Sequence, residues 1–258
     1  MNAVDHGRLA SYDLIAALDL PATALVNQRV PKKLLVENGA PTTADRKLIQ
    51  DSIEEITWVA ALKPASIGVP EYRDEQRSYL ELAVLLVELR ETGKVARLAE
   101  LIHRAIPYPV LLILSDAGGL MLSLAHFRWA QKEADKTVLD GELSMVRLSD
   151  QPSGQSDFLQ ALCLRCQPRT DLHALYQGWL DTLTALQVAA ITGRFVASGS
   201  AEQAAARRAA LHRCREIDGE VARLRLAAAK EKQMARQVAV NLELKALLAE
   251  RERTAANL

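Results

Sequence analysis

The sequence predicts an α+β protein, in which a mixed β-sheet with packed helices is followed by a long C-terminal helical arm of coiled-coil type. Three observations lead to this prediction. Residues 79–113 have the pattern strand, helix, strand, and residues 116–148 add further strand patterns. After Pro168 the chain has no proline and is rich in residues that favour helix. With 258 residues and 49% apolar side chains, the chain can bury a large core.

The stretch from Tyr79 to Ile113 carries the strongest pattern. Residues 80–89 are apolar on both faces apart from two glutamates, as expected of an interior strand covered on both sides. Apolar side chains then recur at helical spacing over residues 94–105. The prolines of residues 106–109 end this helix because they lack an amide donor. A second buried strand follows, and a crossover of this length allows a parallel pair.

Weaker patterns predict the other elements of the first half. Ser11 can cap a short helix, and Thr42 and Thr43 precede another. Residues 71–78 read as a charged, exposed connection. The remaining expected elements are helices at 12–18 and 44–55, extended segments at 58–69 and 143–148, and a hairpin partner strand at 120–126.

Residues 25–37 contain the densest basic cluster of the first half, formed by Arg29, Lys32 and Lys33. One interpretation is a solvated loop and edge strand whose lysines discourage aggregation. The other is a contact with phosphate groups of a nucleic acid or with an acidic protein partner. Both interpretations remain open at this point.

The expected domain organisation has three parts. Residues 150–156, with the sequence DQPSGQS, read as a linker, and the chain beyond them is helical. Helices are expected at 158–166 and 171–196. The expected parts are an α/β core domain at 1–150, a helical linker and hairpin at 151–198, and a long C-terminal helix at 199–258.

The long helix expected over residues 201–255 offers a surface for self-association. An antiparallel coiled coil with its twofold axis near Val238 would place Glu231 of one chain opposite Lys245 of the other. The alternative is that the helix packs back on its own chain beside residues 171–196. The residues assigned to oligomerisation are Val221, Leu224, Glu231, Val238, Leu242 and Lys245.

Composition limits the partners and the compartment. Lys plus Arg equals Asp plus Glu at 32 each, so no overall charge favours nucleic acid or a membrane. No apolar run reaches the length of a membrane span, and the first residues do not form a signal peptide. Three cysteines fit a reducing compartment better than a disulfide framework. A cytoplasmic protein without membrane contact is therefore expected.

The usual catalytic and metal-binding motifs are either absent or do not indicate a site. Cys163 and Cys166 form a C-x-x-C, but they share a predicted helix face with apolar residues, so buried core thiols are expected rather than zinc ligands. His126 has no Ser, Cys and acid arrangement that indicates a triad. The sequence contains no Walker motif and no G-x-G-x-x-G. No cofactor is expected.

One weak catalytic alternative lies at the end of the central strand. The order of elements around Glu88-Leu89-Arg90 follows that of PD-(D/E)xK nucleases, and Glu71 could supply the first acid. Such enzymes hold a divalent metal, normally Mg²⁺, against the scissile phosphate. Here Arg90 stands where lysine is needed, and arginine cannot readily lose a proton to activate water.

Several short motifs are spread over nearly the whole chain: Asn27-Gln-Arg-Val-Pro-Lys32, Ile106-Pro-Tyr-Pro109, Ser123-Leu-Ala-His126, Leu175-Tyr-Gln-Gly-Trp179, and Lys230-Glu-Lys-Gln233 followed by Asn241 and Lys245. Their order and spacing resemble those of the bacterial domain-of-unknown-function 4391 family. The resemblance implies companions of helicase and DNA methyltransferase genes in restriction-like or defence loci, and it transfers no catalytic residue.

The functional expectation is a non-catalytic accessory or adaptor subunit of a bacterial DNA-defence or restriction-like system. It would form a homo-oligomer through its C-terminal helix and contact a helicase or DNA methyltransferase. Two alternatives stay open: a divalent-metal-dependent nuclease that uses Mg²⁺, and a protein that binds DNA or RNA directly.

Overall fold

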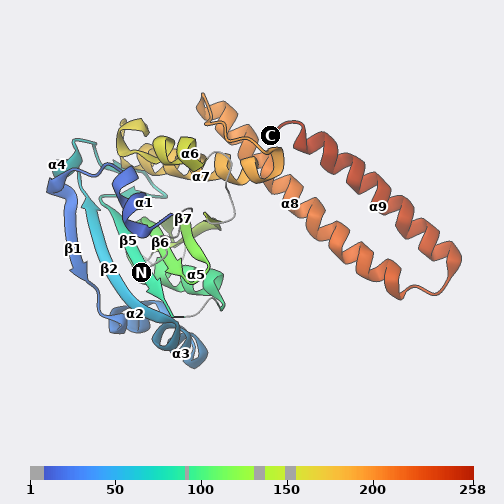
Figure 1. Ribbon diagram of the computed structural model, residues 1–258, viewed down its shortest axis with the longest axis horizontal. Coiled ribbons are helices and arrows are strands. Elements are labelled where there is room, and N and C mark those ends of the chain that lie inside the picture. The colour runs from blue at the N-terminus through green and yellow to red at the C-terminus, as the bar shows by residue number, and fades with distance from the viewer. Residues whose placement is uncertain (1–8, 91–92, 131–136, 149–154) are drawn as a thin grey trace, which may run out of the picture. The chain divides into compact units, whose positions relative to one another are not determined.

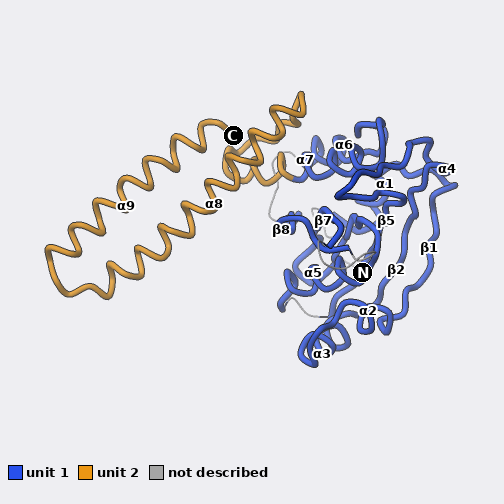
Figure 2. Tube along the Cα trace, turned by 180° about the vertical axis from the view of Figure 1, so that it is seen from behind, with its two compact units in different colours: residues 1–183 blue, residues 184–258 orange. Residues whose placement is uncertain are grey.

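The computed structural model (Figure 1) describes residues 9–90, 93–130, 137–148 and 155–258. It divides into two compact units, residues 1–183 and 184–258 (Figure 2). The boundary expected at residue 150 falls outside the described residues, and the division lies instead inside α7 (Leu172–Thr192). Within the described part of the chain, no helix has both the length and the apolar character needed to cross a membrane.

Unit 1 is built on a mixed sheet with the strand order β1-β2-β5-β6-β7-β8. The neighbours β5 and β6 are parallel and are joined by α5 (Val95–Ala105), whereas all other neighbours in this sheet are antiparallel. The strand, helix and strand predicted for residues 79–113 are confirmed. The strands of this sheet are β1 (Leu25–Arg29), β2 (Ile53–Leu62), β5 (Leu82–Leu89), β6 (Val110–Asp116), β7 (Gly119–Trp129) and β8 (Thr137–Arg147).

Helices cover both faces of this sheet. Figure 1 shows α2, α3 and α5 on one side and α1, α6 and α7 on the other. Consecutive residues of β5, such as Val84 and Leu85, point to opposite faces, and both are fully buried. The remaining helical segments of unit 1 are α1 (Ser11–Ala17), η1 (Ala22–Ala24), α2 (Lys32–Gly39), α3 (Thr43–Ser52), α4 (Pro64–Ile67), α6 (Gln155–Leu162) and η2 (Leu164–Cys166).

Two segments read as loops from the sequence are regular structure. Residues 32–39 form α2, whose Gly39 approaches α5 so closely that an added Cβ would lie 2.5 Å from the Leu101 carbonyl oxygen. This tertiary packing selects the helix, because eight residues are too few to be stable as an isolated helix. The charged segment 71–78 contributes to a small hairpin of β3 (Tyr72–Arg73) and β4 (Ser78–Tyr79).

Unit 2 contains a helical hairpin rather than one long helix. The prediction of a continuous helix over residues 201–255 is wrong: α8 (Ala201–Lys230) and α9 (Met234–Ala255) are separated by Glu231–Gln233. Glu231 is extended, and its carboxylate accepts a hydrogen bond of 2.8 Å from the Gln233 amide. Folding back buries the apolar stripe of α8, which a single helix would leave in water.

The C-x-x-C thiols are not core residues, so that expectation is also wrong. α6 ends at Leu162, and the chain turns out before it reaches the two cysteines. Cys163 is half-buried and Cys166 is exposed, and both are free thiols. The Cys166 thiol lies 3.4 Å from the Gln160 carbonyl oxygen. Most of the linker expected at 150–156 lies outside the described residues.

Candidate binding pocket

A pocket of about 310 Å³ lies between β1, α2 and the connection from α5 to β6, and we call it the β1–α2 pocket. Two motifs that are far apart in the sequence, residues 27–32 and 106–109, meet in its lining. The residues that line it include Gln28, Arg29, Val30, Leu35, Asn38, Trp58, Ile106 and Tyr108.

The local backbone of β1 shapes one wall. Among the described strands, β1 lies at the edge of the sheet and pairs with β2 alone, and its register shifts between Leu25 and Gln28. Asn27 lies at this irregularity with a φ of +48°. Asparagine tolerates this left-handed conformation better than most residues. Val26 and Gln28, two residues apart on the strand, both line the pocket.

Two aromatic rings line the pocket from different elements. The indole N–H of Trp58 donates to the Ala60 carbonyl at 2.9 Å, which holds its ring in place. The rings of Trp58 and Tyr108 meet edge to face with centroids 6.3 Å apart. Among the described residues, no side-chain hydrogen bond engages Gln28, Asn38 or the Tyr108 hydroxyl. These polar groups therefore remain open to a ligand.

The three basic residues of the predicted cluster have different surroundings. Lys32 turns inward and donates to the Ile53 carbonyl, and burial, followed by the charge of Arg90, lowers the pKa of its ammonium group. Lys33 pairs with Glu37 on the next turn of α2, at 3.5 Å. Arg29 lines the pocket, with a side chain that is 69% exposed and lies 3.8 Å from the nearest oxygen of Glu55.

The residues of the nuclease alternative are not all brought together. Glu88 lies near the C-terminal end of β5, opposite Glu55 of β2. Glu71 precedes β3, which pairs with β4 just before β5 begins. The length of β5, roughly 25 Å at 3.3 Å per residue, separates the two sites. Within the described ranges, no group of three or more His, Cys, Asp or Glu residues is placed to hold a metal ion.

Arg90, the residue in place of the nuclease lysine, is engaged in an ion pair. Its guanidinium donates to Glu54, and this hydrogen bond lowers the pKa of the Glu54 carboxyl and raises that of Arg90. Glu54 is the extra residue of the β-bulge in β2, between Ile53 and Glu55. A paired guanidinium that stays charged cannot serve as a base here.

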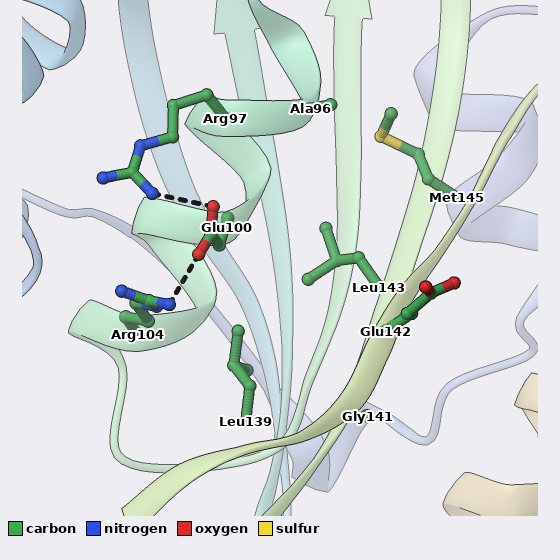
Figure 3. A pocket seen from close by; sticks show the side chains of 9 residues that line it. All are labelled: Ala96, Arg97, Glu100, Arg104, Leu139, Gly141, Glu142, Leu143 and Met145. Atoms are coloured by element: carbon green, nitrogen blue, oxygen red, sulfur yellow. Dashed lines mark hydrogen bonds and ion pairs between the residues drawn. The ribbon is translucent and has the colours of Figure 1, made fainter. Parts of the chain in front are cut away.

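A larger pocket of about 560 Å³ lies between α5 and β8 (Figure 3). Arg97 and Arg104 flank Glu100 and contact its carboxylate at 2.8 and 2.6 Å. Arg97 also donates to both oxygens of Asp45, at 3.0 and 2.9 Å. These hydrogen bonds hold the pKa of the Asp45 carboxyl at about 2. Both arginines of this pocket are therefore already committed to carboxylates of the protein.

A second meeting of distant motifs consists of buried Tyr79 and Tyr176 and half-buried His126 and Gln177, and we call it the α7 clamp. The Tyr176 hydroxyl accepts from the backbone amide of Ala125 at 3.0 Å and donates to the carbonyl of residue 110 at 2.8 Å. Nε2 of His126 donates to Gln177 Oε1 at 2.9 Å, while its Nδ1 accepts from the Tyr79 hydroxyl. Burial lowers the pKa of His126 to about 4. This cluster joins α7 to the sheet through a neutral imidazole.

The residues assigned to oligomerisation divide into two groups. Val221 and Leu224 are buried within the hairpin of α8 and α9, so they are internal contacts of one chain. Val238 and Leu242 are 52% and 64% exposed on α9. Glu231 lies between the two helices, and Lys245 lies on the exposed part of α9.

Sequence reasoning missed the aromatic wall of the β1–α2 pocket. Tyr108 was visible as the centre of a proline-rich motif, and Trp58 began an expected extended segment. Their proximity depends on β2 and on the connection after α5, which are far apart in the sequence. No local pattern predicts it.

The fold and the pocket define an α+β protein with a mixed sheet, a small pocket at the edge of the sheet, and a second unit that contains a helical hairpin. The chain belongs to the family described as Domain of unknown function (DUF4391), whose model matches residues 18–250. No curated protein and no solved structure gives a significant match.

Proposed function

We propose that the chain is a non-catalytic accessory or adaptor subunit that self-associates through the exposed face of α9. The observation that carries the proposal is a row of large apolar side chains on this helix. Met234, Val238 and Leu242 follow one another at intervals of four residues and are 76%, 52% and 64% exposed. Such spacing places them on one face, and an exposed apolar face of this kind marks an interaction surface.

A second copy of the chain fits this face in an antiparallel arrangement. With the twofold axis near Val238, Met234 of one chain lies opposite Leu242 of the other. The helical spacing that would set Glu231 opposite Lys245 does not apply here, because Glu231 lies in the turn before α9 begins at Met234. The dimer proposed here therefore joins two hairpins rather than two single long helices.

The test is the mass of the full chain in solution, measured by light scattering over a range of concentrations. Val238→Asp places two carboxylates at the axis and should raise the dimer dissociation constant by about tenfold or more. Leu226→Asp is the matched control, because Leu226 is 65% exposed on α8 and outside the row. Circular dichroism checks that both variants keep their helix content. A wild-type mass of one chain at every concentration contradicts the proposal.

The proposed setting is a bacterial DNA-defence or restriction-like system in the cytoplasm, with a helicase or DNA methyltransferase as the partner. The family resemblance supports this partner class. The full chain should copurify with the tagged product of a neighbouring helicase or methyltransferase gene. Failure of every such pair to copurify counts against the adaptor role.

Two competing functions have direct tests. A nuclease should cleave DNA with Mg²⁺ or Mn²⁺ and lose cleavage in Glu88→Ala, since Glu88 stands opposite Glu55 across the β2–β5 pair. A direct nucleic-acid binder should show salt-sensitive affinity that falls when Arg29, Lys32 and Lys33 are changed. Either result would replace the adaptor proposal.

A further inference from the structure

We propose that the β1–α2 pocket binds a linear peptide segment of a protein partner, which carries one large apolar or aromatic side chain close to a carboxylate. This inference deepens the adaptor role, because it describes how a partner is held. It uses residues of unit 1 only, so its test is separate from that of the α9 dimer.

The inner surface of the pocket suits an apolar anchor. Val30, Leu35 and Ile106 are buried below it, and the rings of Trp58 and Tyr108 line it. Its volume of about 310 Å³ lies at the lower end of the range of ligand sites, roughly 300 to 1,000 Å³. This space suits a single large side chain rather than an extended cofactor. Buried aromatic and aliphatic anchors of this kind dominate the energy of many interfaces.

The rim of the pocket suits a carboxylate beside that anchor. Among the described residues that line the pocket, Arg29 alone is charged, and its separation of 3.8 Å from Glu55 is too long for a hydrogen bond. A ligand carboxylate can therefore form a charge-assisted contact with the exposed guanidinium. The amides of Gln28 and Asn38 are free to bind peptide groups.

The surrounding charges favour a peptide over a nucleic acid. A nucleic-acid strand gains its affinity from several phosphate contacts. Here Lys32 already donates to a backbone carbonyl, and Lys33 and Arg90 are paired with carboxylates of the protein. Within the described part of the chain, Arg29 alone brings a loosely held charge to the pocket lining, and one such charge matches one carboxylate better than a chain of phosphates.

The edge strand beside the pocket favours binding through side chains. β1 is irregular where Asn27 has a positive φ, between the paired residues Leu25 and Gln28. Such a bulge interrupts the regular row of amide and carbonyl groups that an added strand would need. The peptide is therefore held mainly by its anchor and its carboxylate.

The experiment is selection of peptides from a random phage-displayed library on the immobilised full chain. The expected result is a shared sequence in which an aromatic or large aliphatic residue lies near Asp or Glu. The best peptide is then synthesised with a fluorescent label, and its affinity is measured by anisotropy. Arg29→Glu should weaken binding by about tenfold or more. Selection on that variant should favour Lys or Arg in place of the acid.

Matched variants separate the pocket from its surroundings. Asn38→Trp fills the pocket from an exposed position of α2 and should abolish binding. Gln50→Trp, at an exposed position of α3 away from the pocket lining, should leave binding unchanged. Lys33→Glu is the charge control and should have little effect, because Lys33 does not line the pocket. Circular dichroism and thermal unfolding check that each variant is folded.

Three results for the pocket itself would overturn the inference. These are the absence of any shared peptide sequence, equal binding by Asn38→Trp, and binding of labelled oligo(dT) that the peptide cannot displace and Arg29→Glu removes. Val238→Asp distinguishes this inference from the dimer proposal, since loss of the dimer should leave peptide affinity unchanged. Peptide binding lost only in Val238→Asp would also contradict the assignment to this pocket.

Discussion

The α7 clamp and the β1–α2 pocket are both places where motifs distant in the sequence meet, yet their polar groups have different surroundings. In the clamp, the polar groups of His126, Tyr176 and Gln177 bond to other groups of the protein. In the pocket, Gln28 and Tyr108 have no such partner among the described residues. A motif whose polar groups are satisfied internally serves stability, whereas one that leaves them open is available to a ligand.

The largest expected effect is that of Tyr176→Phe, which tests whether the clamp is structural. The change removes a hydroxyl that serves the buried amide of Ala125 and the carbonyl of residue 110. Each buried group left without a partner costs about 1–3 kcal/mol, so the free energy of unfolding should fall by about 2–5 kcal/mol. Urea unfolding measures this loss. A change below about 0.5 kcal/mol would show that the clamp does not stabilise the fold, and so does not differ from the pocket in this respect.

Lowering the pH should destabilise the folded protein through His103 and His126. Burial lowers the pKa of His103 to about 3 and that of His126 to about 4. The unfolded chain, with a histidine pKa of about 6.5, therefore takes up protons first. Stability should fall by up to about 4 kcal/mol between about pH 6.5 and about pH 5, since each group contributes at most about 1.4 kcal/mol per pH unit.

Unfolding by urea at each pH measures this decline. His126→Gln should make the decline with pH less steep, because one of the histidines with a lowered pKa is removed. An unchanged slope would show that His126 takes up its proton equally in the folded and unfolded states. Peptide affinity should not follow this titration.

Gly39→Ala tests how the wall of the pocket is positioned. A Cβ at this position would lie 2.5 Å from the Leu101 carbonyl oxygen and 2.7 Å from the Ala105 Cβ, so α2 must move away from α5. Such overpacking costs about 1–3 kcal/mol. Because Leu35 and Asn38 of α2 line the pocket, affinity for the selected peptide should fall too. A drop in stability with no change in affinity would show that α2 does not shape the pocket.

The smallest expected effect on stability is that of Arg29→Ala. Its ion pair with Glu55 is long and exposed, and such pairs contribute little. The free energy of unfolding should change by less than about 0.5 kcal/mol, while peptide affinity decreases. Thermal unfolding and anisotropy on the same sample measure the two quantities. A large loss of stability would show that Arg29 stabilises the fold and is not free for binding.

Local patterns predicted much of the fold for a physical reason. β5, α5 and β6 are each specified by their own residues: apolar runs for the strands, helical spacing for α5, and prolines after it. The eight residues of α2 have no such support on their own. They are helical because Gly39 lets α2 pack closely on α5.

The candidate site was predictable only in part. Arg29 was singled out as a basic residue, but nothing in residues 25–37 distinguished it from Lys32 and Lys33. The structure separates them through their partners: a carbonyl for Lys32, a carboxylate on the next turn for Lys33, and a distant carboxylate for Arg29. Partners of this kind depend on how α2 lies against β2.

By itself, the sequence determined the core strands, the helix that joins them, and the helical character of residues 201–255. Only the tertiary structure decided that this last segment folds back at Glu231–Gln233, that Glu88 stands beside Glu55 and not Glu71, and that residues 27–32 meet residues 106–109. The physical reason is the distance along the chain over which each effect acts. Periodicity and proline act within a few residues, whereas strand register and helix packing depend on contacts between segments that are distant along the chain.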